Sequence, residues 1–461
     1  MVHKGFKKYI RDKKFYKLVI AVALPLMLQQ LATSSVNLLD NLMIGQLGDA
    51  ALGAVAAVNR FYMIAIFATN GVLAASSIYI AQFFGAKDEE HMKQSFRFAL
   101  IVAYLFAIVA FFLGILFPEQ IIRFFTADVS VIALGIDYIK IAAWTFMFMA
   151  LSLAVSSSMR SIGESHIPLR ISVTAVIING ILNYIFIFGH FGIPAMGVKG
   201  AAYATVIARF IEAALFLYIV IKRHFPFATR IKDLFKISKR LVKTIIAKAT
   251  PLGINELLWS GGMATLFKFY ATRGSEVLSG YSIANTIGDL FFVLFGGMAV
   301  ASTILISQPL GANNLDEARD NAYWLLGFSF ILAIVFGLLM FASSFIIPNL
   351  YNISDEARYI ATTALRVMSV MFWVYMINTE CYFILRAGGD MKSTMAMDSL
   401  YMWIINLPIV GFFAYYTSLP IIALYLIGQS TDLLKMAFSF HLVKKEKWVV
   451  NLTNVVHDEI I

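Results

Sequence analysis

The chain has 461 residues, of which 60% are hydrophobic and 14% are charged, and its formal net charge is +10 at pH 7. Soluble globular chains are roughly 45–50% apolar, and the apolar residues here form long blocks instead of amphipathic stripes. This composition excludes a soluble globular protein. The Lys and Arg residues concentrate between the apolar blocks, a pattern that orients membrane proteins and does not indicate a nucleic-acid partner.

The apolar blocks, taken in chain order, predict twelve membrane-spanning helices. Residues 98–117 are typical, because they contain no charge and match the roughly 20 residues that cross a bilayer. The expected helices are residues 16–44, 53–83, 95–117, 131–158, 168–189, 199–222, 246–271, 277–308, 321–346, 359–385, 394–416 and 419–441.

Several chemistries are excluded. Cys381 is the only cysteine, so the chain forms no internal disulfide and no metal-thiolate site is expected. The basic N-terminus leads into a long apolar run without a small-residue cleavage site, which predicts a retained first helix. A Walker loop, HExxH and GxSxG are missing. We therefore expect no enzyme, no ATP-driven pump, no cofactor and no metal.

Basic segments recur between the expected helices. They are the N-terminus, residues 87–97, residues 159–170, residues 222–248 and the C-terminal tail. With twelve helices, all of them fall on one side of the membrane. The positive-inside rule then predicts a multi-pass protein of the cell membrane with both termini in the cytoplasm.

The domain organisation follows from these segments. We expect an N-terminal six-helix bundle at 1–221, a basic cytoplasmic linker at 222–248, a C-terminal six-helix bundle at 249–441 and a cytoplasmic tail at 442–461. Apolar residues alternate with lysines in the linker. This pattern fits either a solvated basic connection or an amphipathic helix that lies on anionic lipid.

The two halves are a tandem repeat with an offset of 226 residues (251 − 25). The same residue type recurs at this offset across the chain. Even two basic residues inside apolar helices, Lys140 and Arg366, are 226 apart. The matching pairs include Pro25 and Pro251, Gly48 and Gly274, Asn59 and Asn285, Ser76 and Ser302, Gln82 and Gln308, Gly85 and Gly311, Arg160 and Arg386, Gly163 and Gly389, and Pro194 and Pro420.

An even number of helices in each half makes both halves enter the membrane in the same direction. The repeats are then related by an axis along the membrane normal. Parallel repeats of this kind are a transporter architecture with the site between the halves.

The repeated motifs resemble those of the MATE (multidrug and toxic compound extrusion) family of the MOP superfamily. The resemblance covers nearly the whole chain and depends on the order and spacing of the motifs. It implies two six-helix bundles around a central V-shaped cavity, and drug efflux driven by inward H⁺ or Na⁺. The motifs are VNLLDNLMIGQLGDAALGAVAAVNR around Asp40, IAQFFGAKD, ISQPLGANN, MRSIGES, LRAGGDMK and NGILNYIFIFGHFGIPAMGVKGAAYAT.

Asp40 is the leading candidate for ion coupling, because an ionisable residue inside a membrane helix is a functional candidate. Thr33, Asn37 and Asp40 lie at i, i+4 and i+7 on one face of the first helix. A carboxyl that is removed from water can take up and release protons near neutral pH. In the family, the aspartate at this place is the coupling carboxylate. The alternative is a purely structural acid that holds the packing.

Further polar residues of the first half are expected near Asp40. Asn179 and Asn183 lie at i and i+4 on the fifth helix, and Thr205 belongs to the GAAYAT motif of the sixth. Many MATE proteins carry aspartate where this chain has Asn183, so the charge available for Na⁺ is reduced and H⁺ is favoured. Structural hydrogen bonds between helices are the alternative for the amides. Arg209 and Glu212 are expected to form an intramembrane pair with each other or with a neighbour.

The second half carries its own acids, which are secondary candidates for coupling. Their counterparts at the offset are uncharged, and the family's glutamate of the seventh helix does not align well with Glu256. The secondary candidates are Glu256, Asp289, Glu380 and Asp398.

The sequence thus predicts an all-α, secondary-active multidrug efflux antiporter. It would export cationic amphipathic molecules in exchange for H⁺, or Na⁺, by alternating access. We expect drug-like cations and membrane lipid as partners and a monomer as the working unit. The alternative is a lipid-linked oligosaccharide flippase of the same superfamily, although such proteins usually have more helices and a cationic cavity. A channel or a non-transporting scaffold fits duplicated halves poorly.

Overall fold

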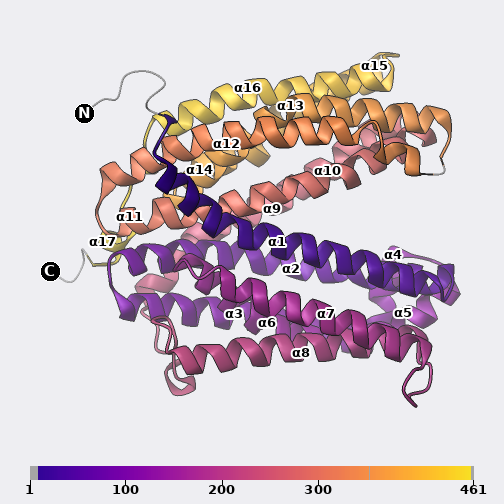
Figure 1. The fold of residues 1–461 in the computed structure, drawn as a ribbon, viewed down its shortest axis with the longest axis horizontal. Helices are drawn as coiled ribbons and strands as arrows, with labels where there is room; N and C mark the ends of the chain where they lie inside the picture. Colours follow the sequence, from indigo (N-terminus) through magenta and orange to yellow (C-terminus); the bar gives the residue numbers. More distant parts are fainter. Residues whose placement is uncertain (1–8, 352, 458–461) are drawn as a thin grey trace. The chain divides into compact units, whose positions relative to one another are not determined.

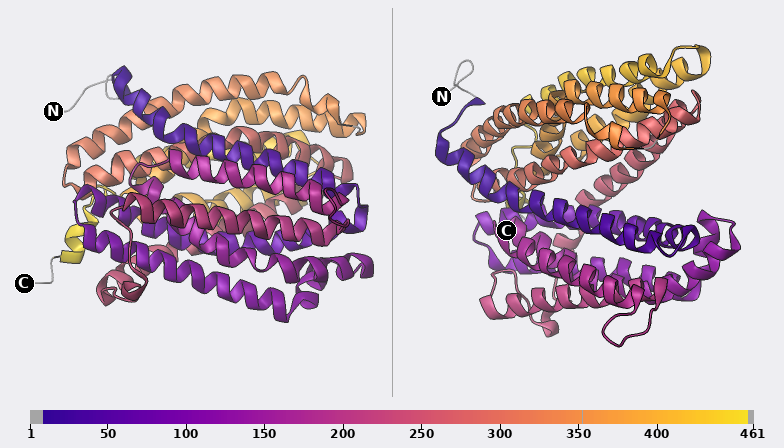
Figure 2. Two further views of the ribbon diagram at one scale, coloured as in Figure 1. Left: turned by 60° about the horizontal axis from the view of Figure 1, so that its bottom comes forward. Right: turned by 45° about the vertical axis from the view of Figure 1, so that its right-hand side comes forward.

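The structure is a computed structural model that describes residues 9–351 and 353–457. Within these ranges the chain forms helices and connecting loops and no strand. Figure 1 shows the helices in chain order. In both views of Figure 2 the helices within each half run roughly side by side.

The described residues of the first half form eight α-helices and the loop that follows them. Gly48 begins α2 and Asp128 begins α5, and the Asp128 carboxylate accepts hydrogen bonds from the first turn of its helix. The helices are α1 (Lys13–Gly45), α2 (Asp49–Gly85), α3 (Glu89–Leu116), α4 (Pro118–Phe125), α5 (Val129–Ala142), α6 (Thr145–Ser161), α7 (His166–Phe188) and α8 (Gly197–Arg223).

The second half repeats this order, with three π-helical turns within its spans. π-Turns often occur at functional sites. Its elements are α9 (Lys239–Ala271), α10 (Ser275–Ser302), η3 (Thr303–Ser307), α11 (Gln308–Gly311), α12 (Leu315–Ser343), η4 (Ile347–Leu350), α13 (Asp355–Ala387), α14 (Met391–Met395), η5 (Ala396–Leu400), η6 (Met402–Asn406), α15 (Leu407–Tyr416), α16 (Ile421–Lys444) and α17 (Leu452–His457).

The helices have the length and composition of membrane spans. In the described part of the chain, ten of them are long and apolar enough to cross a membrane, or eleven when α5 and α6 count as one bent span. The remaining expected span is α9, which is 33 residues long. Its Pro, Gly, Asn and Trp residues lower its hydropathy.

One expected helix is bent. Residues 131–158 were predicted as one span, but α5 and α6 meet at an angle of 51°. At the junction the backbone changes to i→i−3 hydrogen bonds, from Trp144 to Ile141 and from Met147 to Trp144. The tighter bonds account for the bend, since no proline is present there.

The described residues form two compact units, one from Pro25 to Ala249 and the other from the remaining residues on either side. Residues 9–24, which include the first twelve residues of α1, therefore belong with the second half, although the sequence-based boundaries placed them with the first. Aromatic contacts with α12 explain this, because Phe15 meets Trp324 edge-on and Tyr16 stacks on Phe328. Arg11 also lies 4.1 Å above the Trp324 ring.

The repeat is visible in the backbone. The left-handed conformation recurs at the offset of 226, because Gly48 (φ 104°) matches Gly274 (φ 118°), and Lys87 (φ 58°) matches Asn313 (φ 59°). Gly163 and Gly389 form a third such pair. Residues with positive φ set the direction in which the chain leaves a turn. The two halves therefore share turn geometry as well as sequence.

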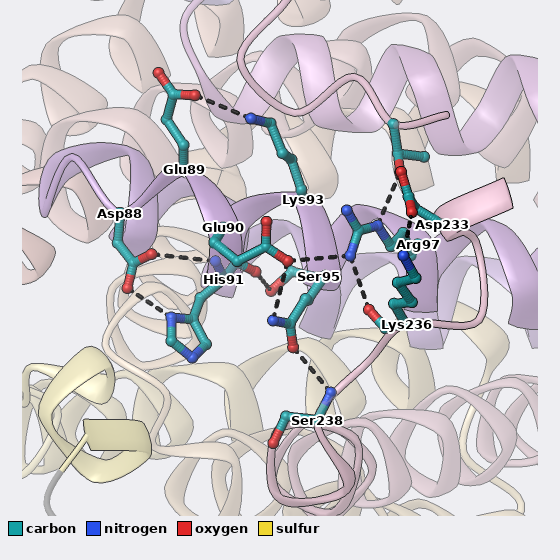
Figure 3. A network of polar contacts seen from close by, with 12 residues as sticks. Asp88, Glu89, Glu90, His91, Lys93, Ser95, Arg97, Asp233, Lys236 and Ser238 are labelled. Carbon is teal, nitrogen blue, oxygen red and sulfur yellow. Dashed lines mark hydrogen bonds and ion pairs between the residues drawn. The ribbon is translucent and has the colours of Figure 1, made fainter. Parts of the chain in front are cut away.

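The segment between the halves packs against α3. Arg97, which is 6% exposed, donates a hydrogen bond to Thr229 Oγ1 (2.8 Å). It also donates to the Lys236 carbonyl (2.8 Å), as Figure 3 shows. The Ser238 amide donates to Gln94 Oε1 (2.9 Å). Between α8 and α9 the only helical turn is the 3₁₀ turn η2 (Ile231–Asp233). The alternative of an amphipathic surface helix is therefore wrong for residues 224–238, which are tied to α3, whereas residues 239–248 are helical and form the start of α9.

Candidate functional site

The unit from Pro25 to Ala249 contains a pocket of about 400 Å³. Side chains from α1, α2, α5, α6, α7 and α8 line it, and about half of them are apolar. This volume lies within the range of small-molecule sites, which combine apolar walls with a few placed polar groups. Its polar lining residues include Asp40, Tyr62, Tyr138, Asn179, Asn183, Thr205 and Arg209.

Asp40 and Asn183 are in direct contact across the pocket. Asn183 Nδ2 donates a hydrogen bond of 2.6 Å to Asp40 Oδ1. Asn183 is 1% exposed, whereas Asp40 keeps an intermediate exposure toward the pocket. The carboxyl is thus held by an amide on one side and open to a ligand on the other.

A second layer of polar groups extends from this contact. Asn183 Nδ2 donates a hydrogen bond to Asn179 Oδ1, and Asn179 Nδ2 donates one to Thr205 Oγ1. Both hydrogen bonds are long, at 3.5 Å. Thr205 also donates to the Ala201 carbonyl (3.0 Å), and the Tyr138 hydroxyl lies beside it. The structure therefore brings together Asp40 and the three polar residues of α7 and α8. The side chain of Asn37 lies outside the described residues.

The Asn183 carboxamide is only half satisfied. In the described part of the chain its Oδ1 atom is buried and accepts no hydrogen bond. Buried polar atoms without a partner are rare and point to a missing donor or ion. The free oxygen belongs to the side chain that binds Asp40.

Arg209 supplies the one cationic group of this pocket's lining. Its Nη1 atom pairs with Glu212 Oε2 at 2.7 Å, and Glu212 is buried. Ser172 Oγ donates to the other carboxylate oxygen (2.8 Å), and Gln29 Nε2 donates to Ser172 Oγ (2.8 Å). The expected Arg209–Glu212 pair is confirmed. It belongs to a network, called here the first clamp, that joins α1, α7 and α8 through Gln29, Ser172, Glu212 and Arg209.

Comparison with known proteins identifies the family. The sequence profile of the MatE family matches residues 25–185 and 251–438. The chain belongs to the MATE family. The matches leave out residues 186–250, which include α8 and the linker, and both ends of the chain. They cover the two halves separately, in agreement with the repeat.

Similar proteins cover nearly the whole MATE chain. A probable multidrug resistance protein of Bacillus subtilis, YoeA, is 26% identical over 437 residues, which are 93% of this chain and 94% of that protein. A probable multidrug resistance protein NorM of Thermotoga maritima is 22% identical over 441 residues, covering 93% and 92%.

Solved structures share the fold. One is a MOP superfamily transporter from Pyrococcus furiosus, with a TM-score of 0.84 at 20% identity over 97% of this chain and 98% of that chain. Its binding pocket is described as having a reversed polarity that suggests a different function. A mutant of the Vibrio cholerae MATE transporter VcmN has a TM-score of 0.85 at 18% identity, covering 95% and 98%.

These findings confirm an all-α, multi-pass membrane protein whose twelve helices form two six-helix bundles. As a MATE protein the chain is a transporter and not an enzyme. The central cavity that the resemblance implies would lie between the units and stays a prediction.

The second half of this MATE protein holds a corresponding ion pair. Lys435 Nζ lies 2.9 Å from Asp398 Oδ1, and Asn255 Nδ2 donates to Asp398 Oδ2 (3.0 Å). The network of Asn255, Asp398 and Lys435, called here the second clamp, joins α9, η5 and α16. Asp432 lies one turn before Lys435 and adds a second carboxylate. Asp398 is therefore neutralised within its own unit.

The other secondary candidates are dispersed. Glu380 is fully buried in α13 and accepts hydrogen bonds from Ser302 (2.6 Å) and Ser329 (3.1 Å). Glu256 is half-buried in α9, and Asp289 is exposed in α10. None of these acids lines the pocket around Asp40. Among the described residues, no three His, Cys, Asp or Glu side chains are placed to hold a metal ion.

The sequence motifs do not point to Tyr62, Tyr138, Asp432 or Lys435. The two tyrosines carry no sequence signal, because aromatic residues are common in membrane helices. Lys435 could have been found, since it lies 226 residues after Arg209 (435 − 209) inside an apolar helix. Asp432 at i−3 would then have followed as its neighbour.

Proposed function

We propose that this MATE protein is a multidrug efflux antiporter that exports cationic amphipathic small molecules in exchange for H⁺ by alternating access. One observation carries the proposal. Among the described residues that line a pocket of about 400 Å³, Asp40 is the single carboxylate. Relatives named as multidrug resistance proteins support drug-like cargo.

The Asp40–Asn183 contact suits proton exchange. When Asp40 is ionised, Asn183 Nδ2 donates to it, as the 2.6 Å hydrogen bond indicates. When Asp40 is protonated, its O–H can donate to the Asn183 carbonyl after the amide turns over. The unpaired Oδ1 atom is the acceptor that this second state needs. A carboxamide beside a carboxyl thus pairs with both protonation states.

Cargo and proton would compete for the same carboxylate. With Asp40 ionised, the charges near the pocket are Asp40 (−1), Arg209 (+1) and Glu212 (−1), which sum to −1. This favours a cationic molecule whose apolar body contacts the walls. Protonation of Asp40 brings the sum to zero and removes the attraction, so the cargo is released. Exchange of one for the other is antiport.

The donor set favours H⁺ over Na⁺ as the coupling ion. A bound Na⁺ would need several oxygen ligands, and Asp40 is the one charged ligand near the amides of Asn179 and Asn183. The absence of a second carboxylate at position 183 weakens such a site. Both termini are proposed to be cytoplasmic, because the basic segments fall on one side of twelve helices.

The decisive variant is Asp40→Asn. It should reduce H⁺-driven uptake of a fluorescent cation into proteoliposomes to background while folding and part of the cargo binding remain, because the amide resembles the protonated state. Transport would be measured under a pH gradient and, separately, under a Na⁺ gradient. Glu256→Gln is the matched control, since Glu256 is an acid of the second half outside this pocket.

The outcomes are distinct. Full pH-driven transport by Asp40→Asn would end the proposal, and loss only in Glu256→Gln would move coupling to the second half. Transport by the wild type under a Na⁺ gradient alone would replace H⁺ by Na⁺. The flippase alternative would require export of a phosphate-bearing lipid, which a pocket with net charge −1 disfavours.

A further inference from the structure

A second pocket lies at the other end of the C-terminal unit from α17. Its volume is about 360 Å³, and it is formed where α12 passes through η4 into α13. Figure 1 shows this turn far from α17. Eight residues line it, and all but Phe345 carry a polar group: Ser344, Phe345, Asn349, Asp355, Arg358, Tyr359, Thr362 and Arg366.

The pocket has a net positive charge. Arg358 and Arg366 contribute +2 and Asp355 contributes −1, which leaves +1. Arg358 Nη1 pairs with Asp355 Oδ1 at 2.9 Å, so this arginine is neutralised. Its Nε–H is buried and, within the described residues, has no acceptor. The uncompensated charge of the pocket therefore belongs to Arg366.

Arg366 is held in place by neutral groups. Its Nε atom lies 3.3 Å from Ser344 Oγ, and its guanidinium lies 4.6 Å above the Phe345 ring. No ion pair found among the described residues includes it. A guanidinium that keeps its terminal N–H groups free is the preferred side chain for binding a phosphate with two parallel hydrogen bonds. The hydroxyls of Tyr359 and Thr362 are further donors.

The depth of Arg366 matches the edge of a bilayer. α13 has 33 residues, about 50 Å at 1.5 Å per residue, and exceeds a hydrocarbon core of about 30 Å by about 20 Å. Arg366 lies eleven residues after Asp355, the first residue of α13, which is about 16 Å along the helix. If the excess is shared equally between both ends, about 10 Å of helix precedes the hydrocarbon, and Arg366 lies about 6 Å inside its edge. A long basic side chain reaches the headgroups from this depth.

The surface beside the pocket is apolar. Leu338, Phe341, Phe345 and Ile346 are exposed on α12 and the turn after it. Exposed apolar side chains at this level suit acyl chains, whereas a free anion would gain nothing from them. The pocket thus combines a cationic donor site with an adjoining acyl-chain surface.

We propose that this pocket binds the phosphate of an anionic glycerophospholipid, with Arg366 as the principal ligand and Arg358 as a second donor. The lipid belongs to the leaflet at the α12–α13 end of the unit. A bound lipid would bridge α12 and α13, since its phosphate contacts residues of both helices. The site is separate from the pocket around Asp40, and the inference does not depend on the proposed transport cycle.

The test uses the purified full-length protein in detergent. Thermal unfolding is measured with dioleoylphosphatidylglycerol, with dioleoylphosphatidylcholine and with inorganic phosphate, and native mass spectrometry counts bound lipids. Phosphatidylglycerol should stabilise the wild type most, and Arg366→Met should weaken its apparent affinity at least about tenfold, or about 1.4 kcal/mol. Arg366→Lys, which keeps the charge but not the bidentate geometry, should fall in between.

Lys140→Met is the matched control. Lys140 is the basic residue at the equivalent position of the first half (366 − 226), and it lies exposed on α5 outside any pocket described above. Its loss should leave phosphatidylglycerol binding unchanged. An equal loss in both variants would show general charge attraction and overturn the proposal. Stabilisation by inorganic phosphate alone with the same Arg366 dependence would also overturn it in favour of a free anion.

Discussion

The two clamps occupy equivalent places in the two halves but distribute their charges differently. At the offset of 226, Gln29 corresponds to Asn255, Ser172 to Asp398 and Arg209 to Lys435. In each half an amide of the first helix donates to a residue of the fifth, and a cation of the sixth completes the network. The contact pattern has thus been kept while the side chains changed.

The position of the carboxylate differs between the clamps. In the first clamp it is Glu212, on the same helix as its cation, whereas in the second it is Asp398 on the facing segment η5. Glu212 has no acidic counterpart in the second half, since the residue 226 positions later is Phe438. A buried pair can therefore be rebuilt on a different helix, provided that each unit still neutralises its cation.

The surroundings of the two cations also differ. Arg209 lines the pocket that holds Asp40, whereas Lys435 lies between Asp398 and Asp432 in a packed region. The first clamp is thus placed to influence the proposed coupling site, and the second to hold helices together. Variants at equivalent positions can separate these two roles.

The largest effect is expected from removing the carboxylates. Glu212→Gln leaves Arg209 without its buried partner and should cost about 3 kcal/mol, the lower end of the range for a broken buried pair, because Arg209 is 32% exposed. Asp398→Asn should cost less, about 1–2 kcal/mol, since Asp432 still faces Lys435. Unfolding by sodium dodecyl sulfate measures both.

Transport distinguishes the two variants further. In Glu212→Gln the freed Arg209 can pair with Asp40 and should reduce H⁺-driven efflux strongly, and the double variant Arg209→Met/Glu212→Gln should recover part of it. Asp398→Asn should lower stability more than transport. Equal losses of transport in both carboxylate variants, without recovery in the double variant, would contradict the comparison.

A smaller effect is expected from the amides. Gln29→Leu removes one hydrogen bond to Ser172 and should cost about 0.6 kcal/mol, the average for a bond between membrane helices. Asn255→Leu should cost more, up to about 1.7 kcal/mol. Asn255 is buried, donates to the charged Asp398 and also accepts from the Ser399 amide (3.2 Å).

The same unfolding titration checks this order. If Gln29→Leu lowered the free energy of unfolding more than Asn255→Leu, the first clamp would stabilise α1 more than its contacts indicate. Gln30→Leu is a suitable control on α1, because it is the neighbouring amide and has no part in the clamp.

Much of the fold follows from the sequence. Uninterrupted apolar blocks and the offset of 226 give the helices, their grouping into halves and the turns at Gly48 and Gly274. The bend between α5 and α6 has no such signal, because the junction around Trp144 contains no proline or glycine. The course of the linker depends on the burial of Arg97 against it, which is a tertiary contact that periodicity does not encode.

The candidate site is predictable only in part. Helical spacing and the family motifs point to Asp40, Asn179, Asn183 and Thr205, which the structure places in one pocket. Their roles remain predictions. The unpaired Asn183 oxygen and the clamps could not be predicted, since they depend on which side chains meet across helices.

The smallest effect is expected at the helix caps, where the halves again differ in one charge. Asp128 begins α5 and Ser354, 226 residues later (354 − 128), begins α13. The Asp128 carboxylate accepts hydrogen bonds from the Ser130 hydroxyl and from the Ser130 and Val131 amides, which lowers its pKa. Ser354 accepts one from the Ala357 amide (3.2 Å).

The stability contribution of the Asp128 cap should therefore depend on pH, whereas that of the Ser354 cap should not. Because the folded pKa of Asp128 is lowered, its contribution is present above the ordinary pKa of aspartate, about 3.9, and is lost as the pH falls through the lowered value. Ser354 has no charge to lose, and Ser354→Ala should cost about 0.5 kcal/mol, the low end for a lost cap, at every pH. Melting temperatures between pH 7 and pH 3 should show the gap between wild type and Asp128→Ala closing below about pH 4, while the Ser354→Ala gap stays constant. A constant gap for both would mean that the Asp128 cap acts through its shape and not through its charge.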